Sequence, residues 1–322
     1  MPVTLLGDSV SRLVPDFIRI RTMLVRLLPL LLLTACARAD VPVFEQIATL
    51  EQDSLVEASG LARSQRDSTV FWALNDGGSK ARLWALDAEG RHLGRITIEG
   101  VKNRDWEDLA SFTLDDTPYL LVADIGNNEA KHKSLKLHIV EEPDLSLDNK
   151  VKLEPAWSMS AQYPEGPRDA ESVAVDIANQ QILVLTKRDL PPQLYSVPLK
   201  PDKDKLMATR LGSVKTLPWP TKRDVEYAPI RKEWHWQPTA MDISADGTLA
   251  AIMTYRWALV YERSPGESWM DTLAKKPTAV SLNGFKDAEA MMFDADNEHM
   301  YATVEKRFAP LLRASIPGEQ QP

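Results

Sequence analysis

A six-residue motif recurs five times along this chain and divides most of it into units of similar length. Each copy begins with a polar or acidic residue, contains a small residue and has an apolar residue at its fifth position. The copies are Glu57–Ala62, Asp105–Ala110, Asp169–Ala174, Gln237–Asp242 and Asp287–Met292. The apolar fifth positions are separated by 48, 64, 68 and 50 residues. Such intervals suit one four-stranded blade with its loops, repeated around an axis. The repeat therefore predicts an all-β chain folded as a single β-propeller of four-stranded antiparallel blades.

Each unit follows the same order of apolar runs and turns. In the third unit the expected strands and turn are residues 171–176, the turn 177–180, and then strands at 181–187, 193–198 and 207–217. Turns between first and second strands carry Asp, Asn, Gly or Pro, as tight reversals require. The second strands are almost wholly apolar, which is typical of strands buried on both faces.

The two chain ends are expected to close the ring. The fifth unit ends after its third strand, near residues 310–316, whereas residues 43–50 have the pattern of a strand without a unit of their own. Pairing these segments gives five blades and leaves no open sheet edge. The intervals of 64 and 68 residues leave room for a sixth blade.

The charge of the chain disfavours nucleic acid as a partner. The sequence has 38 Lys and Arg against 46 Asp and Glu, a formal charge of −8. Residues 1–35 contain four Arg and two Asp, so removing them leaves 34 against 44, or −10. A surface with this charge repels phosphate backbones.

The N-terminus predicts export and a lipid anchor. From Met23 a basic start is followed by a short apolar run, which is too short to span a bilayer but suits a cleaved signal. Leu33-Thr34-Ala35-Cys36 resembles the bacterial lipobox, which implies cleavage before Cys36 and lipid attachment to its sulfur. Cys36 is the only cysteine, so a disulfide framework is excluded; a plain signal peptide is the alternative.

The expected division of the chain follows from these features. Residues 1–35 form the signal, 36–42 a lipidated linker, 43–318 the propeller and 319–322 a tail. Residues 1–22 do not have signal character, and translation starting at Met23 would explain them. Ala37 after Cys36 lacks the Asp that retains enterobacterial lipoproteins at the inner membrane, which favours the outer membrane in a host with two membranes.

Several of these motifs together resemble those of a bacterial family. Ser59–Ala62, Asp105–Ala110, Val122–Asn128 and Asp169–Ser172 look like secreted β-propellers of the SdiA-regulated and phytase-like (esterase-like) kinds, over roughly residues 43–316. Related propellers include calcium-binding proteins, phosphohydrolases and lactonases. This chain lacks the dense Asp-rich loops of phytases, which argues against hydrolysis of inositol phosphates.

Polar residues from all five units are expected to meet at one mouth of the channel, because motif starts and second-strand ends lie on the same face of a propeller. The candidate ligand or metal residues are Glu57, Asp76, Asp105, Glu107, Asp124, Asn127, Asp169, Glu171, Asp287 and Glu289. The candidate anion-binding residues are Lys187, Arg188, Arg256, Lys306 and Arg307.

Crowded carboxylates require positive charge nearby. One source is a hard cation, calcium above all, which takes six to eight oxygen ligands. Another is the basic set itself, paired with the carboxylates. A third interpretation is structural: the Asp and Glu residues clamp each blade to its neighbour through backbone N–H groups or an arginine.

The long connection between units three and four, residues 218–238, is expected to lie over the same mouth. Its aromatic residues, Trp219, Tyr227, Trp234 and Trp236, are candidate lid residues that could stack on a ligand or simply cover a blade edge. Loops of this length are often binding elements.

Two functions remain open at this stage, and the sequence does not settle whether the chain is an enzyme. The first is a lipid-anchored envelope module that binds a small ligand, a glycan or a protein partner at the mouth. The second is a calcium-dependent hydrolase of phosphate esters or lactones. The sequence contains no His-Glu-x-x-His zinc motif, Gly-x-Ser-x-Gly elbow or glycine-rich phosphate loop.

Overall fold

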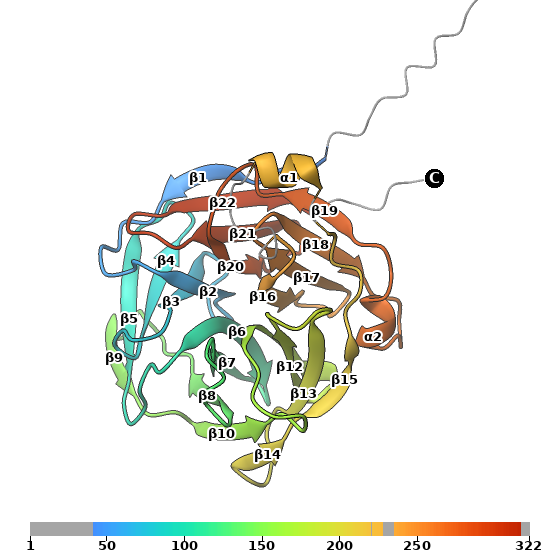
Figure 1. The fold of residues 1–322 in the computed structure, drawn as a ribbon. Helices are drawn as coiled ribbons and strands as arrows, with labels where there is room; N and C mark the ends of the chain where they lie inside the picture. Colours follow the sequence, from blue (N-terminus) through green and yellow to red (C-terminus); the bar gives the residue numbers. More distant parts are fainter. Residues whose placement is uncertain (1–40, 220, 228–234, 317–322) are drawn as a thin grey trace, which may run out of the picture. The chain divides into compact units, whose positions relative to one another are not determined.

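A computed structural model of the chain describes residues 41–219, 221–227 and 235–316. These residues fold into five sheets arranged in a ring (Figure 1). The predicted five-bladed β-propeller is therefore confirmed. The signal segment and Cys36 lie outside the described residues. Within the described residues, no helix is both long and apolar enough to cross a membrane.

Each of the first two blades has four antiparallel strands and a fifth, parallel strand at its outer edge. Blade 1 contains β2 (Ala58–Arg63), β3 (Val70–Asn75), β4 (Arg82–Asp87), β5 (His92–Ile98) and β9 (Lys150–Leu153). Blade 2 contains β6 (Trp106–Leu114), β7 (Thr117–Asp124), β8 (Leu135–Glu141), β10 (Trp157–Gln162) and β14 (Lys205–Met207).

The other three blades have four antiparallel strands each. Blade 3 contains β11 (Ala170–Asp176), β12 (Gln181–Thr186), β13 (Gln193–Pro198) and β15 (Thr209–Ser213). Blade 4 contains β16 (Pro238–Ile243), β17 (Leu249–Thr254), β18 (Trp257–Glu262) and β19 (Thr278–Ser281). Blade 5 contains β20 (Ala288–Phe293), β21 (His299–Val304), β22 (Pro310–Ser315) and β1 (Glu45–Thr49). Within the described part of the chain, three short helices connect strands: η1 (Ile177–Asn179), α1 (Lys222–Tyr227) and α2 (Trp269–Thr272).

The ring closes through the two ends of the propeller, as the sequence predicts. β1 pairs with β22 in antiparallel register, from Glu45 opposite Arg313 to Thr49 opposite Pro310. Just before β1, the N–H of Phe44 donates to the carbonyl of Ser281 in blade 4 at 2.8 Å. The N-terminal segment therefore bonds to two blades at once.

The long intervals in the repeat hold edge strands and not a sixth blade. β9 lies in the 64-residue interval and extends blade 1, while β14 lies in the 68-residue interval and extends blade 2. In the chain, β9 lies between strands of blade 2 but pairs with blade 1. Likewise, β14 lies between strands of blade 3 but pairs with blade 2. This exchange joins neighbouring blades at the outer edge.

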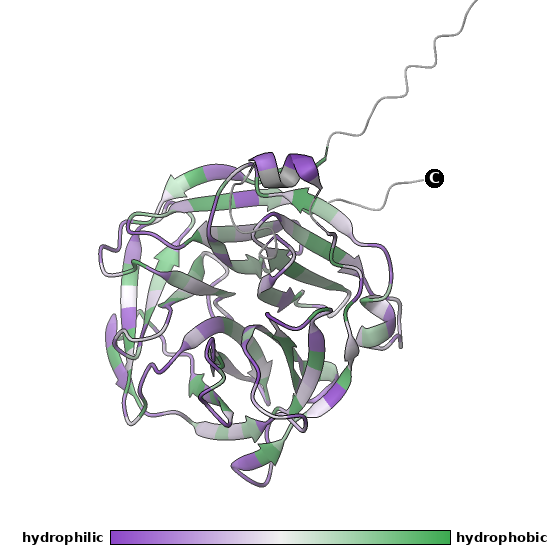
Figure 2. Cartoon of the chain, in the orientation of Figure 1, coloured by the Kyte–Doolittle hydropathy of each residue, from purple (hydrophilic) through white to green (hydrophobic). Residues whose placement is uncertain are grey.

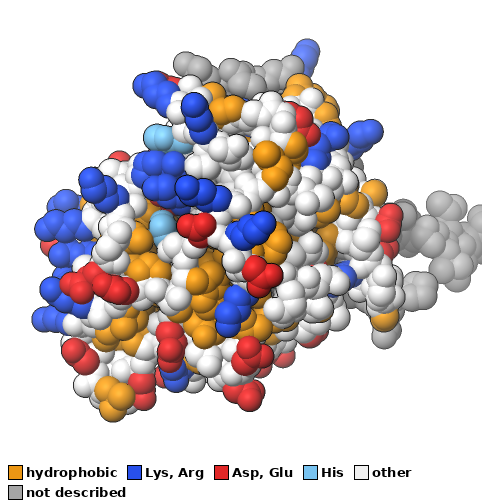
Figure 3. All heavy atoms as spheres, turned by 90° about the horizontal axis from the view of Figure 1, so that it is seen from below, with side chains coloured by type: hydrophobic (Ala, Val, Ile, Leu, Met, Phe, Trp, Pro, Cys, Tyr) orange, Lys and Arg blue, Asp and Glu red, His pale blue; other side chains and the backbone are white. Residues whose placement is uncertain are grey.

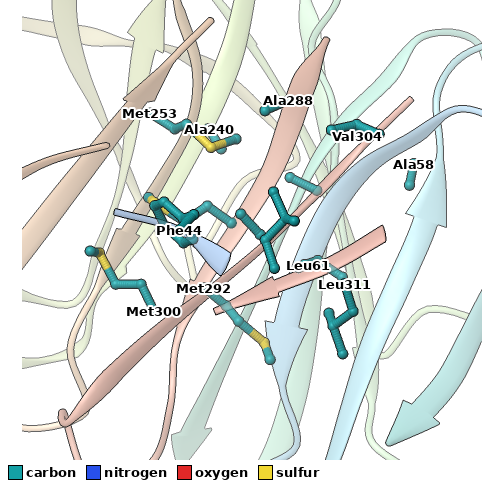
Figure 4. Close-up of a cluster of buried hydrophobic side chains, with 14 of the residues drawn as sticks. Phe44, Ala58, Leu61, Ala240, Met253, Ala288, Met292, Met300, Val304 and Leu311 are labelled. Carbon is teal, nitrogen blue, oxygen red and sulfur yellow. The ribbon is translucent and has the colours of Figure 1, made fainter. Parts of the chain in front are cut away.

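The core fills the spaces between blades. Phe44, Leu61, Met292 and Leu311, which come from the N-terminal segment and two blades, belong to one buried cluster (Figure 4). The strands are mainly hydrophobic and the loops hydrophilic (Figure 2), as expected for strands covered on both faces. The surface in Figure 3 carries both charges, with Lys and Arg gathered toward its upper left, so the net negative charge is not evenly spread.

Candidate functional site

A β-bulge at the start of the first strand of every blade explains the repeated motif. The pairing register between first and second strands shifts at the same motif position in all five blades, and the extra residues are Ser59, Glu107, Glu171, Thr239 and Glu289. A bulge bends the strand and redirects the side chain of the extra residue. All five of these residues are buried.

The bulge residues have two kinds of side chain. In blades 1 and 4 they are hydroxyl residues that bond to the next blade: Ser59 donates to the carbonyl of Trp106 at 3.2 Å, and Thr239 to that of Ala288 at 3.0 Å. In blades 2, 3 and 5 they are glutamates. Burial and the charges of neighbouring acids, Glu289 among them, raise the pKa of Glu107 and of Glu171. Two bulges are therefore clamps between blades, and the carboxylates of the other three form a cluster.

The residues that follow the second strands form a second layer of this cluster, beside the bulge residues. They are Asp76, Gly126, Lys187, Tyr255 and Glu305, one from each blade. The backbone N–H of four of them bonds to the carbonyl of the residue two positions before the bulge, at 2.8 to 3.1 Å. These hydrogen bonds hold the strand-end residues next to the bulge residues.

One half of the cluster is organised around Lys187, whose side chain is 6% exposed. Its ammonium group donates to Glu171, donates to the Tyr255 hydroxyl at 2.9 Å and lies 3.9 Å from Glu289. The Tyr255 hydroxyl donates to Glu289. Burial would lower the pKa of Lys187, but the charges of Glu171 and Glu289 raise it on balance. Lys187 is therefore the internal counter-ion of two bulge glutamates.

Glu305 extends this half of the cluster. Burial raises the pKa of Glu305 to about 9, and the nearby charges of Glu289 and Asp76 add to the effect. At neutral pH this carboxyl group therefore holds its proton.

The other half of the cluster is a group of three carboxylates, and the charges of Arg104 and His132 act on one of them, Asp105. Asp76, Asp105 and Glu107 each place a carboxylate oxygen within 4.8 Å of the other two. Glu107 is only 3% exposed, and Lys187, whose charge interacts with it, donates its hydrogen bonds to Glu171 and Tyr255 instead. Burial, followed by the charges of Glu171 and Asp76, raises the pKa of Glu107 well above its ordinary value. We call these three residues the tricarboxylate group.

Gly126 leaves the space that the tricarboxylate group occupies. A β-carbon at this position would clash with Glu107 Oε1 and lie 2.6 Å from Asp105 Oδ2. Burial and the charges of Asp105 and Glu289 also raise the pKa of Asp76 to about 6, although a hydrogen bond from the N–H of Gly77 opposes this. Three oxygens in this arrangement suit a hard cation, which would supply the missing positive charge.

Two candidate ligands act as structural clamps. Asp124 accepts from Arg104 Nε at 3.0 Å and from the N–H of Asp105 at 3.2 Å. Asp169 accepts from Arg188 Nε at 2.6 Å and from the N–H of Asn127 at 2.7 Å, which joins blade 3 to the loop after β7. The carboxylates of Asp124 and Asp169 are thus bound to protein cations, as the clamp interpretation expects.

Asn127 holds its own loop closed. Its amide group donates to the carbonyl of His132 at 2.9 Å and accepts from the N–H of the same residue at 2.9 Å. Arg188 also donates to Asn128, so it links two loops at this mouth.

The remaining candidates are not members of the tricarboxylate group, although the charge of Glu57 contributes to the raised pKa of Asp76. Glu57, Asp287, Lys306 and Arg307 have exposed side chains. Arg256 stacks on Trp257 at 4.3 Å and donates to Ser281 at 3.0 Å.

The candidate lid residues are only partly described. The rings of Trp219 and Trp236 lie 5.4 Å apart and line a cavity of about 270 Å³ with Leu190 and Pro191. Trp219 is 60% exposed and Trp236 is buried. The backbone of Tyr227 ends α1. Trp234 lies outside the described residues.

Sequence reasoning missed Glu305 and Asp108. Glu305 directly precedes Lys306, and ending the second strand one residue earlier would have identified it. Asp108 lies inside the second copy of the motif and is fully buried. It accepts from the N–H groups of Leu109 at 2.8 Å, Val173 at 2.8 Å and Met241 at 3.4 Å, so it joins three blades. An acid at a position where the other four copies have Gly, Ser or Ala was the available signal.

Comparison with known proteins supports the fold. A crystal structure of the major Malassezia sympodialis allergen, Mala s 1, aligns with a TM-score of 0.52 over 85% of this chain and 98% of the allergen, at 11% identity. Identity this low shows the fold alone. No protein-family model and no curated protein matches the chain.

Proposed function

We propose that this chain is an exported lipoprotein whose propeller binds a divalent cation, calcium, at the channel mouth and uses it to hold a small, oxygen-rich ligand. The observation that carries the proposal is the tricarboxylate group, in which buried Glu107 has no protein counter-charge in hydrogen-bond contact among the described residues. A buried carboxylate without a partner is costly, and a bound cation would remove that cost.

The number of protein ligands supports binding of a further molecule. Calcium takes six to eight oxygens, and the tricarboxylate group supplies three residues. Water or a ligand would complete the coordination. Glycans, carboxylates and phosphate esters all offer such oxygens, and an envelope protein could present a carboxylate in the same way.

The export and anchoring part of the proposal is supported by the sequence before Cys36. The basic start, the short apolar run and the lipobox-like Leu33-Thr34-Ala35-Cys36 suit lipid attachment, with the outer membrane favoured by Ala37. The resemblance of its motifs to those of SdiA-regulated and phytase-like propellers supports an envelope role. Such an anchor would hold the propeller beside the membrane.

A calcium-dependent hydrolase is the second candidate. It is favoured by the open coordination positions, because a cation with such positions can polarise a phosphate or lactone group or activate water. Lys187 is already bound to Glu171 and Tyr255, which makes it a poor independent anion-binding group. Release of product from phosphate esters and lactones, measured with calcium and then with a chelator, would separate this candidate from binding alone.

The cation site is tested by calorimetric titration of the chelator-treated protein with calcium. We expect saturable binding, and we expect Glu107→Gln to weaken it by about tenfold or more because one charged ligand is lost. Glu129→Gln is the matched control: Glu129 is an exposed glutamate in the loop after β7 and should leave the affinity within about twofold. Equal affinities for all three proteins would show that calcium does not bind at the tricarboxylate group.

A further inference from the structure

The face of the propeller opposite the tricarboxylate group has two cavities, and one arginine lines both of them. A cavity of about 220 Å³ lies where β2, β6, β11 and β16 end, and a second of about 610 Å³ lies between blades 1 and 5. Arg63, the last residue of β2, lines both. The larger cavity has the size of sites that bind small organic molecules, which is about 300–1,000 Å³.

Arg63 has unused hydrogen-bond donors. Its side chain is only 12% exposed, and its one ion-pair contact among the described residues is with Asp242 at 3.6 Å, which is longer than a hydrogen bond. The two oxygens of Asp242 already accept from the N–H groups of Ile243 and Phe293, each at 2.8 Å. A guanidinium group offers five N–H donors in a planar fork that fits a carboxylate.

Half of the residues that line the larger cavity are apolar. They are Val70, Phe71, Ala88, Leu93, Met292, Ala295 and Tyr301. The acidic residues that line it already have partners: Asp87 and Glu89 contact Arg91 at 2.7 and 3.2 Å, and Asp294 accepts from two backbone N–H groups. Of the two arginines that line this cavity, Arg63 is therefore the buried one, and it makes no hydrogen bond among the described residues.

We propose that the larger cavity is a groove that binds an amphipathic monocarboxylate, a medium-chain fatty acid in its simplest form. The carboxylate accepts two hydrogen bonds from Arg63, and the alkyl chain lies along the apolar wall between blades 1 and 5. The site lies at the opposite end of the channel from the tricarboxylate group, so it does not depend on the cation proposed there.

The test is a calorimetric comparison of decanoate with decanol, each at a concentration below micelle formation and with a chelator present. We expect the wild-type protein to bind decanoate about 10- to 100-fold more tightly than decanol, because a hydrogen-bonded charge pair is lost with the alcohol. Arg63→Met should remove this preference and leave the affinity for decanol within about threefold.

Arg91→Met is the matched control, since Arg91 borders the same groove but its charge is paired and its side chain exposed. It should keep the preference for decanoate. If Arg63→Met fails to fold, the wild-type comparison decides alone. Equal affinity of the wild type for both molecules, or binding of neither, would overturn the proposal, as would an unchanged preference in a folded Arg63→Met protein.

Discussion

Replacing Lys187 by methionine is expected to lower the free energy of unfolding by roughly 3–5 kcal/mol at neutral pH. Removing one partner of a buried ion pair leaves the other charges without compensation. Here the ammonium group contacts Glu171 and Tyr255 and lies near Glu289, and all three side chains are buried. The measurement is urea unfolding at pH 7.

The control for this variant is Lys306→Met, which removes an exposed lysine from the same mouth. It should change the free energy of unfolding by less than about 1 kcal/mol. The loss in Lys187→Met should shrink toward pH 5, because Glu171, whose pKa is already raised by burial, can then take up a proton. A loss of under about 1 kcal/mol at pH 7 would show that Lys187 is not the counter-ion of this cluster.

Asp108→Asn is expected to cost roughly 2–4 kcal/mol, since each buried donor left without an acceptor costs about 1–3 kcal/mol. One carboxylate oxygen of Asp108 accepts from Leu109, and the other accepts from Val173 and Met241 in the next two blades. Burial raises the pKa of Asp108 and these three N–H groups lower it. An amide would turn its NH₂ group toward N–H donors.

Asp115→Asn makes the same chemical change in the exposed turn between β6 and β7. Asn tolerates the left-handed conformation found there, with φ of 49°, so little loss is expected. Equal unfolding midpoints for the two variants would mean that Asp108 does not hold the three blades together.

The sequence was sufficient to predict the ring of blades because each blade buries its strands in the same way. The motif spacing predicted five blades, and the unpaired apolar segment at residues 43–50 predicted the closure by β1. It did not predict β9 and β14. These strands are short and rich in lysine, and they pair in parallel with strands distant in sequence, so no local pattern marks them.

The candidate site was harder to predict in detail. The repeat indicated that strand-start carboxylates would share one mouth, and the structure brings Asp76, Asp105 and Glu107 together. Which carboxylates are paired depends on loop arginines such as Arg104 and Arg188, whose positions follow from tertiary packing. Occupation of the site by a cation stays a prediction.

The central claim predicts opposite effects of protons and calcium on stability. The pKa values of Asp76 and Glu305 are raised to about 6 and about 9, above the ordinary values of 3.8 and 4.5. Without a cation, the folded protein therefore binds more protons than the unfolded chain between about pH 4 and pH 9, and its stability should fall as pH rises through that window. A bound cation favours the ionised carboxylates and should oppose this fall.

The most direct measurement is thermal unfolding of the chelator-treated protein at pH 5 and pH 8, each with and without calcium. We predict a lower midpoint at pH 8 than at pH 5 without calcium, and a rise on adding calcium that is larger at pH 8. At about 100 times the dissociation constant, calcium should add roughly 2.7 kcal/mol of stability. An unchanged midpoint at pH 8 in millimolar calcium would contradict the cation site and leave the tricarboxylate group as a structural feature of the propeller.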